Sequence, residues 1–261
     1  MPNFKVGNFS SQRLMSVDLR FCYNKSQIWH WAYLDYVGTD WEVKNSIENS
    51  KLSLNHEPRA LDVGCGPQQI HRKTFERCGY KYFGIDINGS MPIIDWDGFV
   101  FPMEDASIDY VLISWTMQNI ENPHRVIEEV WRVLTKGGVV FIVNTILSPV
   151  SFSESESAVL SKLEKSRLYP EGFRIALKKG FKDIQIESKG GIGQILGWKL
   201  HLIWWKCYKN RNSLLRKLFW ALFPFFILFT ISTNIAGLIY NRFDSSGRFS
   251  TYFVLQARKQ D

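Results

Sequence analysis

Residues 60–66 read Ala-Leu-Asp-Val-Gly-Cys-Gly, a short apolar strand that runs into two glycines separated by one residue. Glycine adopts positive φ angles and lets a ligand approach the backbone without meeting a Cβ, so the stretch predicts a ligand-binding turn of a parallel sheet. A second predicted strand, residues 81–86, ends in Asp86, which follows Gly64 by 22 residues. This spacing is close to the ~20-residue offset of a carboxylate that binds ribose hydroxyls. The two segments predict a nucleoside-binding edge of an α/β sheet.

The glycine turn differs from the turn that binds dinucleotides. A dinucleotide site has a third glycine and a helix N-terminus open to a pyrophosphate, whereas Gly66 is followed by Pro67, Gln68 and Gln69. Asp62, just before the turn, would repel a pyrophosphate and suits a cation such as the ammonium of an amino acid. S-adenosylmethionine combines ribose hydroxyls, adenine and an ammonium without a phosphate, so it is the expected cofactor.

Residues 58–147 resemble the core of the class I S-adenosylmethionine-dependent methyltransferases, of the small-molecule type related to quinone-biosynthesis methyltransferases. Four blocks carry the resemblance in order: Leu61–Pro67, Gly84–Asp86, Phe101–Val111 and Asn122–Gly138. The resemblance implies that the methionine end of the cofactor lies at the glycine turn, the ribose at Asp86 and the adenine near Asp97. The implied cofactor-binding residues are Asp62, Gly64, Cys65, Gly66, Asp86, Ile87, Asp97, Gly98, Phe99 and Ser114.

Each of these residues also has a purely structural interpretation. Alone, Asp86 could cap a helix, Asp97 could be a solvated turn residue, and Cys65 is best explained as a small filler. Their joint occurrence in the right order favours the cofactor site. One departure is Gln68, which stands where the family usually has a further glycine, so a side chain there could narrow the cofactor pocket.

The predicted fold is a Rossmann-like seven-stranded methyltransferase sheet with helices on both faces and an apolar helical insert between the last two strands. Residues 1–57 are expected to form an N-terminal helical cap, whose helix covers 24–50, and residues 58–190 the cofactor-binding core. The insert is expected over 191–247 and the last core strand within 248–261. In the family, that strand runs antiparallel between the fifth and sixth strands.

The helix predicted over 122–135 has clear signals at both ends. Asn122 can cap it, Pro123 fits its first turn, and Gly137-Gly138 is expected to end it. On its exposed side, Glu128 and Arg132 are spaced to pair at i,i+4.

Positive charge is concentrated at the C-terminal end of the chain. The net charge is +7, but residues 195–261 hold ten Lys and Arg against two acids, so they carry +8 and residues 1–194 carry −1. These cations flank an uncharged run, which is typical of a membrane surface and not of a nucleic-acid groove. The four cysteines show no paired spacing, no Cys/His cluster has metal-ligand spacing, and the N-terminus is too polar for a signal peptide. We therefore expect a cytoplasmic protein without a metal and without a nucleic-acid partner.

The uncharged run is Leu218–Tyr240, 23 residues that are long enough to cross a hydrocarbon core of ~30 Å. A single crossing would place the last two strands on opposite sides of the membrane, although both belong to one sheet. The insert is therefore expected to re-enter, lie flat or form a helical hairpin, with Pro224 and residues 232–234 as candidate bends. The hypothesis is monotopic attachment at the inner face of the cell membrane. The alternatives are a lid or dimer interface buried against protein, and a true span.

The expected reaction is methyl transfer to a lipid or lipid-linked acceptor, with oxygen of a lipid-linked glycan as the first choice because of resemblance to polysaccharide-assembly methyltransferases. A prenylated quinone methyltransferase is the second choice, and a non-catalytic module that recruits a partner to the membrane is the alternative from another class. Many relatives carry Glu-His where this chain has Gln118 and Asn119, so the general base is unassigned. The candidates are His30, Tyr33 and Tyr169.

Overall fold

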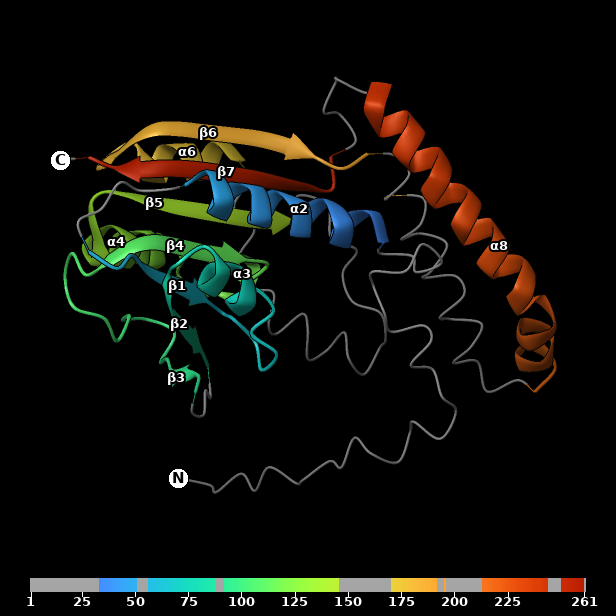
Figure 1. Ribbon diagram of the computed structural model, residues 1–261. Helices are drawn as coiled ribbons and strands as arrows, with labels where there is room; N and C mark the ends of the chain where they lie inside the picture. Colours follow the sequence, from blue (N-terminus) through green and yellow to red (C-terminus); the bar gives the residue numbers. More distant parts are fainter. Residues whose placement is uncertain are drawn as a thin grey trace.

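The computed structural model describes residues 33–50, 56–87, 92–145, 170–191, 195, 213–243 and 250–260. Within these residues, seven strands form one sheet in the order β3-β2-β1-β4-β5-β7-β6 (Figure 1). β1 to β5 run parallel, and β7 lies antiparallel between β5 and β6, which confirms the predicted ending. The strands are β1 (Arg59–Val63), β2 (Lys81–Asp86), β3 (Ile94–Asp95), β4 (Ile108–Ser114), β5 (Leu134–Thr145), β6 (Phe181–Lys189) and β7 (Tyr252–Lys259).

Helices cover both faces of the sheet, as predicted. α2 (Tyr33–Asn49) and α3 (Arg72–Arg77) lie on one face, and α4 (Pro123–Val133) and α6 (Pro170–Leu177) lie on the other (Figure 1). Each face has its own apolar cluster. β4 is buried from Ile108 through its sixth residue, because a parallel strand covered on both faces is apolar almost throughout.

α2 is attached to the sheet by apolar packing and by two hydroxyl pairs. Val43 and Ile47 are fully buried on the sheet side of the helix. The hydroxyl of Ser46 lies 2.7 Å from that of Tyr110, and the hydroxyl of Ser50 lies 2.9 Å from that of Tyr80. The helix that was predicted over 24–50 is confirmed from its tenth residue; the part before it lies outside the described residues.

α4 begins where the sequence indicates but ends earlier. The side chain of Asn122 caps it by accepting the backbone N–H three residues later, at 3.1 Å. The prediction that Gly137-Gly138 ends the helix is wrong: the helix ends at Val133, and β5 begins at Leu134 in an extended conformation. The backbone N–H of Ser107 donates to the carbonyl of Val133. The segment before β4 thus supplies a hydrogen-bond donor to a carbonyl at the C-terminal end of the helix.

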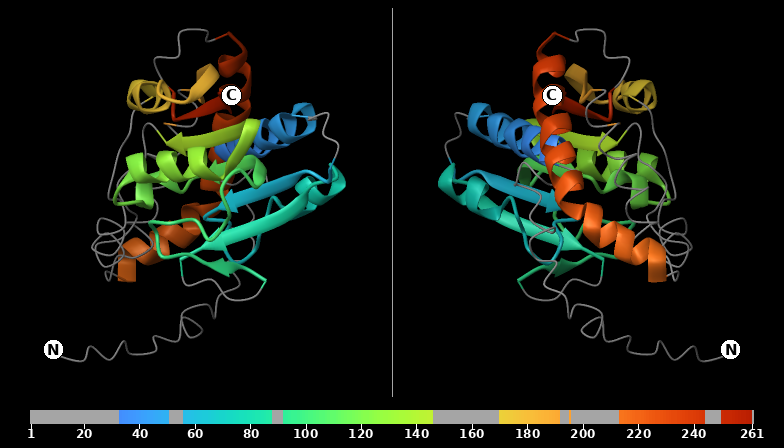
Figure 2. Two further views of the ribbon diagram at one scale, coloured as in Figure 1. Left: turned by 90° about the vertical axis from the view of Figure 1, so that its left-hand side faces the viewer. Right: turned by 90° about the vertical axis from the view of Figure 1, so that its right-hand side faces the viewer.

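The segment between β6 and β7 contains one long helix, α8 (Ser213–Phe243), of 31 residues. The hairpin that was considered for Leu218–Tyr240 is not formed, because α8 continues through Pro224 and through residues 232–234. Figure 2 shows that the helix changes direction along its length, as a proline inside a helix leads us to expect. Viewed toward the carboxyl ends of the parallel strands, α8 crosses in front of the sheet (Figure 2, right).

Candidate cofactor site

The glycine turn after β1 uses its own backbone donors. The N–H groups of Gly64 and Cys65 both donate to the carbonyl of Ile85, at 2.8 and 3.2 Å, and the N–H of Gly66 donates to Asp86 Oδ2 at 2.7 Å. A turn that binds phosphate keeps such donors free for the anion, and α3, at six residues, is too short to add a helix dipole. The geometry therefore agrees with a cofactor that lacks a phosphate.

The two glycines of the turn serve different purposes. Both have positive φ, +71° at Gly64 and +64° at Gly66. A Cβ on Gly64 would lie 2.3 Å from Thr116 Oγ1, whose hydroxyl donates to the carbonyl of Val63 at 3.1 Å. A Cβ on Gly66 would meet no atom within 4 Å. Gly64 thus allows β1 and the turn after β4 to approach, whereas Gly66 borders open space at the sheet edge.

Asp62, the second-last residue of β1, has a buried carboxyl group that is only 1% exposed. Burial raises its pKa to about 7, the charge of Asp86 acts in the same direction, and a hydrogen bond from Tyr82 OH at 3.0 Å opposes both. A cation placed beside Asp62 would favour its charged form. This agrees with the predicted role of binding an ammonium group.

Cys65 fills space between β1 and β2. It is buried, and a Cβ added to Gly84 would lie 2.8 Å from its sulfur, so the two strands meet closely there. Burial, together with the nearby charges of Asp62 and Asp86, raises the pKa of the Cys65 thiol to about 12. A thiol that stays protonated is a poor nucleophile, so Cys65 packs and does not react.

The end of β2 and the loop after β3 come together at the predicted adenine position. Ile87 follows Asp86 and is exposed, and a Cβ on Gly98 would lie 4.0 Å from Ile87 Cδ1. Phe99 and the next residue, Val100, are also about half exposed. Such an apolar group at the edge of a sheet fits a flat aromatic ring.

Asp97 organises the same loop. Its Oδ1 atom accepts the backbone N–H groups of Phe99 and Val100, at 2.8 and 2.9 Å, and these bonds lower the pKa of Asp97. The side chain is exposed, so the contact with an adenine amino group stays a prediction.

Arg132 of α4 fastens this loop to the body, which the sequence did not predict. Its guanidinium donates to the carbonyls of Phe101 and Met103, at 2.9 and 2.8 Å, and pairs with Asp105 at 2.6 Å and Glu129 at 2.7 Å. The expected pair with Glu128 is wrong, since that acid pairs with Arg125. The spacing of charges within the helix could not predict these contacts, because the partners of Arg132 in the loop lie 27 to 31 residues before it in the sequence.

The turn after β4 contains a strained residue. Trp115 has φ +56°, although its bulky side chain disfavours that region, and its ring packs against Tyr252 at 5.9 Å. The next residues form the short helix η2 (Met117–Asn119). Strain of this kind gathers at functional sites, but tryptophan gives no sequence signal for positive φ.

The carboxyl ends of β1, β2 and β4 are neighbours in the sheet, so the structure brings together the predicted residues of the three strands (Figure 1). These are Asp62, Gly64, Cys65 and Gly66 after or in β1, Asp86 and Ile87 at the end of β2, and Ser114 at the end of β4. Asp97, Gly98 and Phe99 stand beside them on the loop after β3. The candidate bases His30 and Tyr169 and the side chain of Tyr33 lie outside the described residues.

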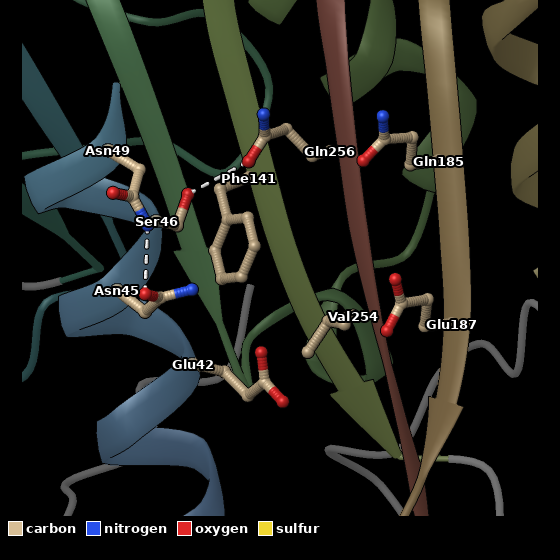
Figure 3. Close-up of a pocket in the computed structure, with 9 residues that line it drawn as sticks. All are labelled: Glu42, Asn45, Ser46, Asn49, Phe141, Gln185, Glu187, Val254 and Gln256. Atoms are coloured by element: carbon tan, nitrogen blue, oxygen red, sulfur yellow. Dashed lines mark hydrogen bonds between the residues drawn. The ribbon is translucent and has the colours of Figure 1, made fainter. Parts of the chain in front are cut away.

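A separate polar cavity of about 150 Å³ lies between α2 and the far side of the sheet (Figure 3). Glu42 of α2 pairs there with Lys189 at 3.0 Å, and Lys189 pairs with Glu187 at 2.7 Å, so the ion pairs join α2 to β6. The cavity opens on β5, β7 and β6, not on the glycine turn, and is distinct from the cofactor site. Its lining residues are Glu42, Asn45, Ser46, Asn49, Phe141, Gln185, Glu187, Val254 and Gln256.

Comparisons with known proteins agree with this geometry. A family model described as a methyltransferase domain matches residues 61–142. The ubiquinone/menaquinone biosynthesis C-methyltransferase UbiE of Bartonella henselae is 26% identical over 114 residues, which cover 42% of this chain and 40% of the relative. The chain thus spans less than half of that relative's length.

Two solved structures share the fold at low identity. Phosphoethanolamine N-methyltransferase 2 of Haemonchus contortus, in complex with phosphomonomethylethanolamine and S-adenosylhomocysteine, has a TM-score of 0.51 at 19% identity and covers 85% of this chain and 53% of its own. The [4+2]-cyclase SpnF has a TM-score of 0.52 at 16% identity and covers 84% and 80%. With the sheet order, the glycine turn and the matched family model, these findings show that the chain contains a methyltransferase domain of the class I, S-adenosylmethionine-dependent fold.

Proposed function

We propose that the protein binds S-adenosylmethionine at the glycine turn and transfers its methyl group. The observation that carries the proposal is the pairing of two carboxyl groups, Asp62 and Asp86, on adjacent strands around a turn whose N–H donors are already used. That arrangement suits a cation and a diol and does not suit a phosphate. The methyltransferases among the relatives support it, whereas the cyclase among the fold neighbours is the reason to test activity directly.

The experiment is titration calorimetry of S-adenosylmethionine into the purified protein. We expect binding, and we expect Asp86→Ala to weaken it at least tenfold, which is about 1.4 kcal/mol. Glu104→Ala is the matched control, because Glu104 is an exposed acid outside the site. Absence of binding to the wild-type protein, or equal affinity after Asp86→Ala with the fold intact, would contradict the proposal.

The cofactor supplies a methyl group that its sulfonium already activates, so the protein's main task is to align the acceptor and exclude water. The turn after β4 carries Gln118 and Asn119, and neither side chain accepts a proton near neutral pH. The reaction proposed for this site therefore depends on positioning by neutral groups at that turn and on an acceptor that is reactive without a strong base there.

Membrane attachment through α8 is the second part of the proposal. Thr230, Asn234 and Gly237, spaced on one side of the helix, are buried, whereas the large apolar side chains point outward. A helix of a water-soluble protein has the opposite arrangement. We define the outer face of α8 as the exposed residues Leu222, Phe225, Leu228, Phe229, Ile235, Leu238 and Ile239.

The polar side chains of α8 are compatible with an apolar solvent. The hydroxyl of Thr230 donates to the carbonyl of Phe226, and that of Ser232 donates to the carbonyl of Leu228, both at 2.9 Å. Within the described residues, α8 contains one stretch, Ala221–Tyr240, that has the length and composition to cross a membrane, and only 17% of it is buried. The low burial argues against a core helix and favours contact with lipid.

The position of α8 relates the membrane to the cofactor site. The helix packs against α2 and crosses the edge at which the parallel strands end (Figure 2). Lys189 of β6 pairs with Tyr252 of β7, so the chain leaves the sheet and returns to it at the same edge. Both facts favour an α8 that lies in one leaflet over an α8 that spans the membrane. The proposed location is therefore cytoplasmic, with the protein attached to the inner face of the membrane.

A site that opens toward lipid favours a lipid or lipid-linked acceptor. An oxygen of a lipid-linked glycan is the first choice, and the similarity to UbiE keeps a prenylated quinone as the second. Incubating membranes and lipid extracts with methyl-labelled S-adenosylmethionine identifies the acceptor by the fraction that becomes labelled. If the protein binds the cofactor and labels no fraction, the non-catalytic membrane-recruiting module is the better account.

Fractionation tests the attachment itself. We expect the protein to stay with membranes in high salt and in carbonate and to be released by detergent. Release by salt or carbonate alone would contradict insertion. A stable dimer in the absence of detergent and lipid would instead indicate that the outer face of α8 is covered by protein.

A further inference from the structure

Two amide side chains near the cofactor site have buried carbonyl oxygens without a hydrogen-bond partner. They are Gln118 Oε1, in η2, and Asn144 Oδ1, in β5; Asn144 is 1% exposed. In the described part of the chain, one further buried side-chain polar atom has no partner, the donor Trp96 Nε1. An unpartnered buried carbonyl is unfavourable, so native proteins rarely keep one unless a ligand or a functional role accounts for it.

The two amides belong to elements that contact each other, η2 and β5. η2 follows β4 and packs against β5, the parallel neighbour of β4, so both amides stand at the carboxyl ends of adjacent strands. Because side chains alternate along a strand, Asn144 faces the same side of the sheet as Ile142. Ile142 and Met117, the residue before Gln118, belong to one apolar cluster, so Asn144 faces the side of the sheet on which η2 packs.

The structure fixes which atom of Gln118 is available. Its Nε2 group donates to the carbonyl of Trp115 at 2.8 Å, so Oε1 is the atom left over. Trp115 holds a strained positive φ, and its ring is packed against Tyr252. The turn that presents Gln118 is therefore held in place, as a residue that contacts a reacting molecule requires.

Asn144 stands in apolar surroundings. Phe253 of β7 lies directly opposite it in the sheet, and the ring of Phe253 packs on that of Phe173 at 5.3 Å. A leucine would fill such a position without an unpartnered carbonyl. The amide is thus a poor choice for stability at this place and calls for another explanation.

We propose that Gln118 and Asn144 form a recognition pair for the molecule that is methylated, in which both carbonyl oxygens accept hydrogen bonds from it. This inference rests on the proposed function and narrows its substrate class. The acceptor must present O–H or N–H donors, as a hydroxyl or amino compound does, and molecules that offer only acceptors, such as carboxylates, are excluded. A neutral amide accepts a hydrogen bond without taking the proton, so the pair orients the acceptor and does not act as its base.

The test compares stability with transfer. We expect Asn144→Leu to raise the melting temperature by several degrees, to leave S-adenosylmethionine affinity within about twofold, and to lower labelling of the membrane acceptor at least tenfold. Gln118→Met should lower the labelling to a similar extent. Gln256→Leu is the matched control: Gln256 Oε1 accepts from Ser46 at 3.1 Å, so its loss should lower the melting temperature and leave labelling unchanged.

Two results for Asn144→Leu overturn the pair. Unchanged labelling shows that the acceptor does not use this amide, and a lower melting temperature shows that the amide supports the fold. A wild-type protein that binds the cofactor but labels no membrane or lipid fraction overturns the proposed function, and the pair falls with it.

Discussion

At the scale of single residues, the charge state of Asp62 links cofactor binding to pH. Its pKa is about 7 in the folded protein, against 3.8 as the ordinary value. Because the folded state holds the proton more tightly than the unfolded state, the carboxyl group lowers stability progressively as pH rises from about 4 to about 7. Asp62→Asn removes this titration.

We therefore expect the melting temperature of Asp62→Asn to exceed that of the wild type by a margin that grows from about pH 4 to about pH 7 and is constant above. Saturating S-adenosylmethionine should reduce the margin near pH 8, because its ammonium stabilises the charged carboxylate. Thermal melts of both proteins across this range are the measurement. A margin that is independent of pH would show that Asp62 is ionised throughout.

The two glycines of the turn give a second prediction. Gly64→Ala should destabilise the protein by about 2–5 kcal/mol, because the new Cβ meets Thr116 at a positive φ. Gly66→Ala has only the φ strain, about 1–2 kcal/mol, but its Cβ points into the space assigned to the cofactor. Chemical denaturation should show the larger loss of unfolding free energy for Gly64→Ala. Calorimetry should show that Gly66→Ala loses more affinity for S-adenosylmethionine, relative to its loss of stability, than Gly64→Ala does. Equal stability losses would contradict the different roles.

At this scale, the sequence predicted at which strand ends the candidate residues stand, but not which groups they contact. The spacing of Gly64 and Asp86 was sufficient to place the two strand ends side by side, because adjacent parallel strands end at one edge. It could not show that Gly66 donates to Asp86, or that Trp115 has a positive φ. Such contacts depend on backbone geometry that no local pattern encodes.

At the scale of elements, α4 controls the loop that carries Asp97. Arg132 bonds two loop carbonyls and two acids, and only a planar guanidinium reaches all four groups. We expect Arg132→Lys to reduce stability by about 1–3 kcal/mol and to weaken S-adenosylmethionine binding severalfold, because the adenine loop loses its attachment. Denaturant unfolding and calorimetry measure the two effects.

Arg125→Lys is the control for that prediction. Arg125 is an exposed arginine of the same helix and pairs with Glu128 at 3.2 Å, so the change should alter stability by less than about 0.5 kcal/mol. If Arg132→Lys has an equally small effect, the loop is held by other contacts.

α8 shows where local signals for a bend mislead at this scale. Pro224 and the polar residues 232–234 were the candidate bends of a hairpin, because proline lacks an N–H and short polar side chains compete for backbone groups. The helix instead continues through its proline, and the hydroxyls of Thr230 and Ser232 donate to carbonyls of the preceding turn. This internal bonding is the arrangement that contact with lipid, as proposed for α8, would require.

At the scale of the whole molecule, the excess positive charge and the exposed apolar face belong to the same segment of the chain. Residues 195–261 carry +8, and the outer face of α8 belongs to the same segment. At a membrane, these cations would attract the protein to anionic headgroups in a salt-dependent manner, and apolar side chains buried in the bilayer would then hold it in a way that salt does not reverse. Attraction and retention should therefore be separable by experiment.

We expect the full-length protein to float with vesicles that contain anionic lipid and to remain bound when salt is added after binding. Replacing Phe225 and Leu228 by serine should reduce flotation at least tenfold without lowering the melting temperature, because both side chains are exposed. Each buried large apolar side chain contributes about 1.5–3 kcal/mol, which is more than the 1.4 kcal/mol of a tenfold change. Asn234→Ala, on the buried side of the helix, should lower the melting temperature and leave flotation unchanged. Equal flotation of the serine variant and the wild type would assign membrane binding to the cations alone. If the wild type is a dimer that does not bind vesicles, and the serine variant is a monomer, the outer face of α8 instead binds a second copy of the chain.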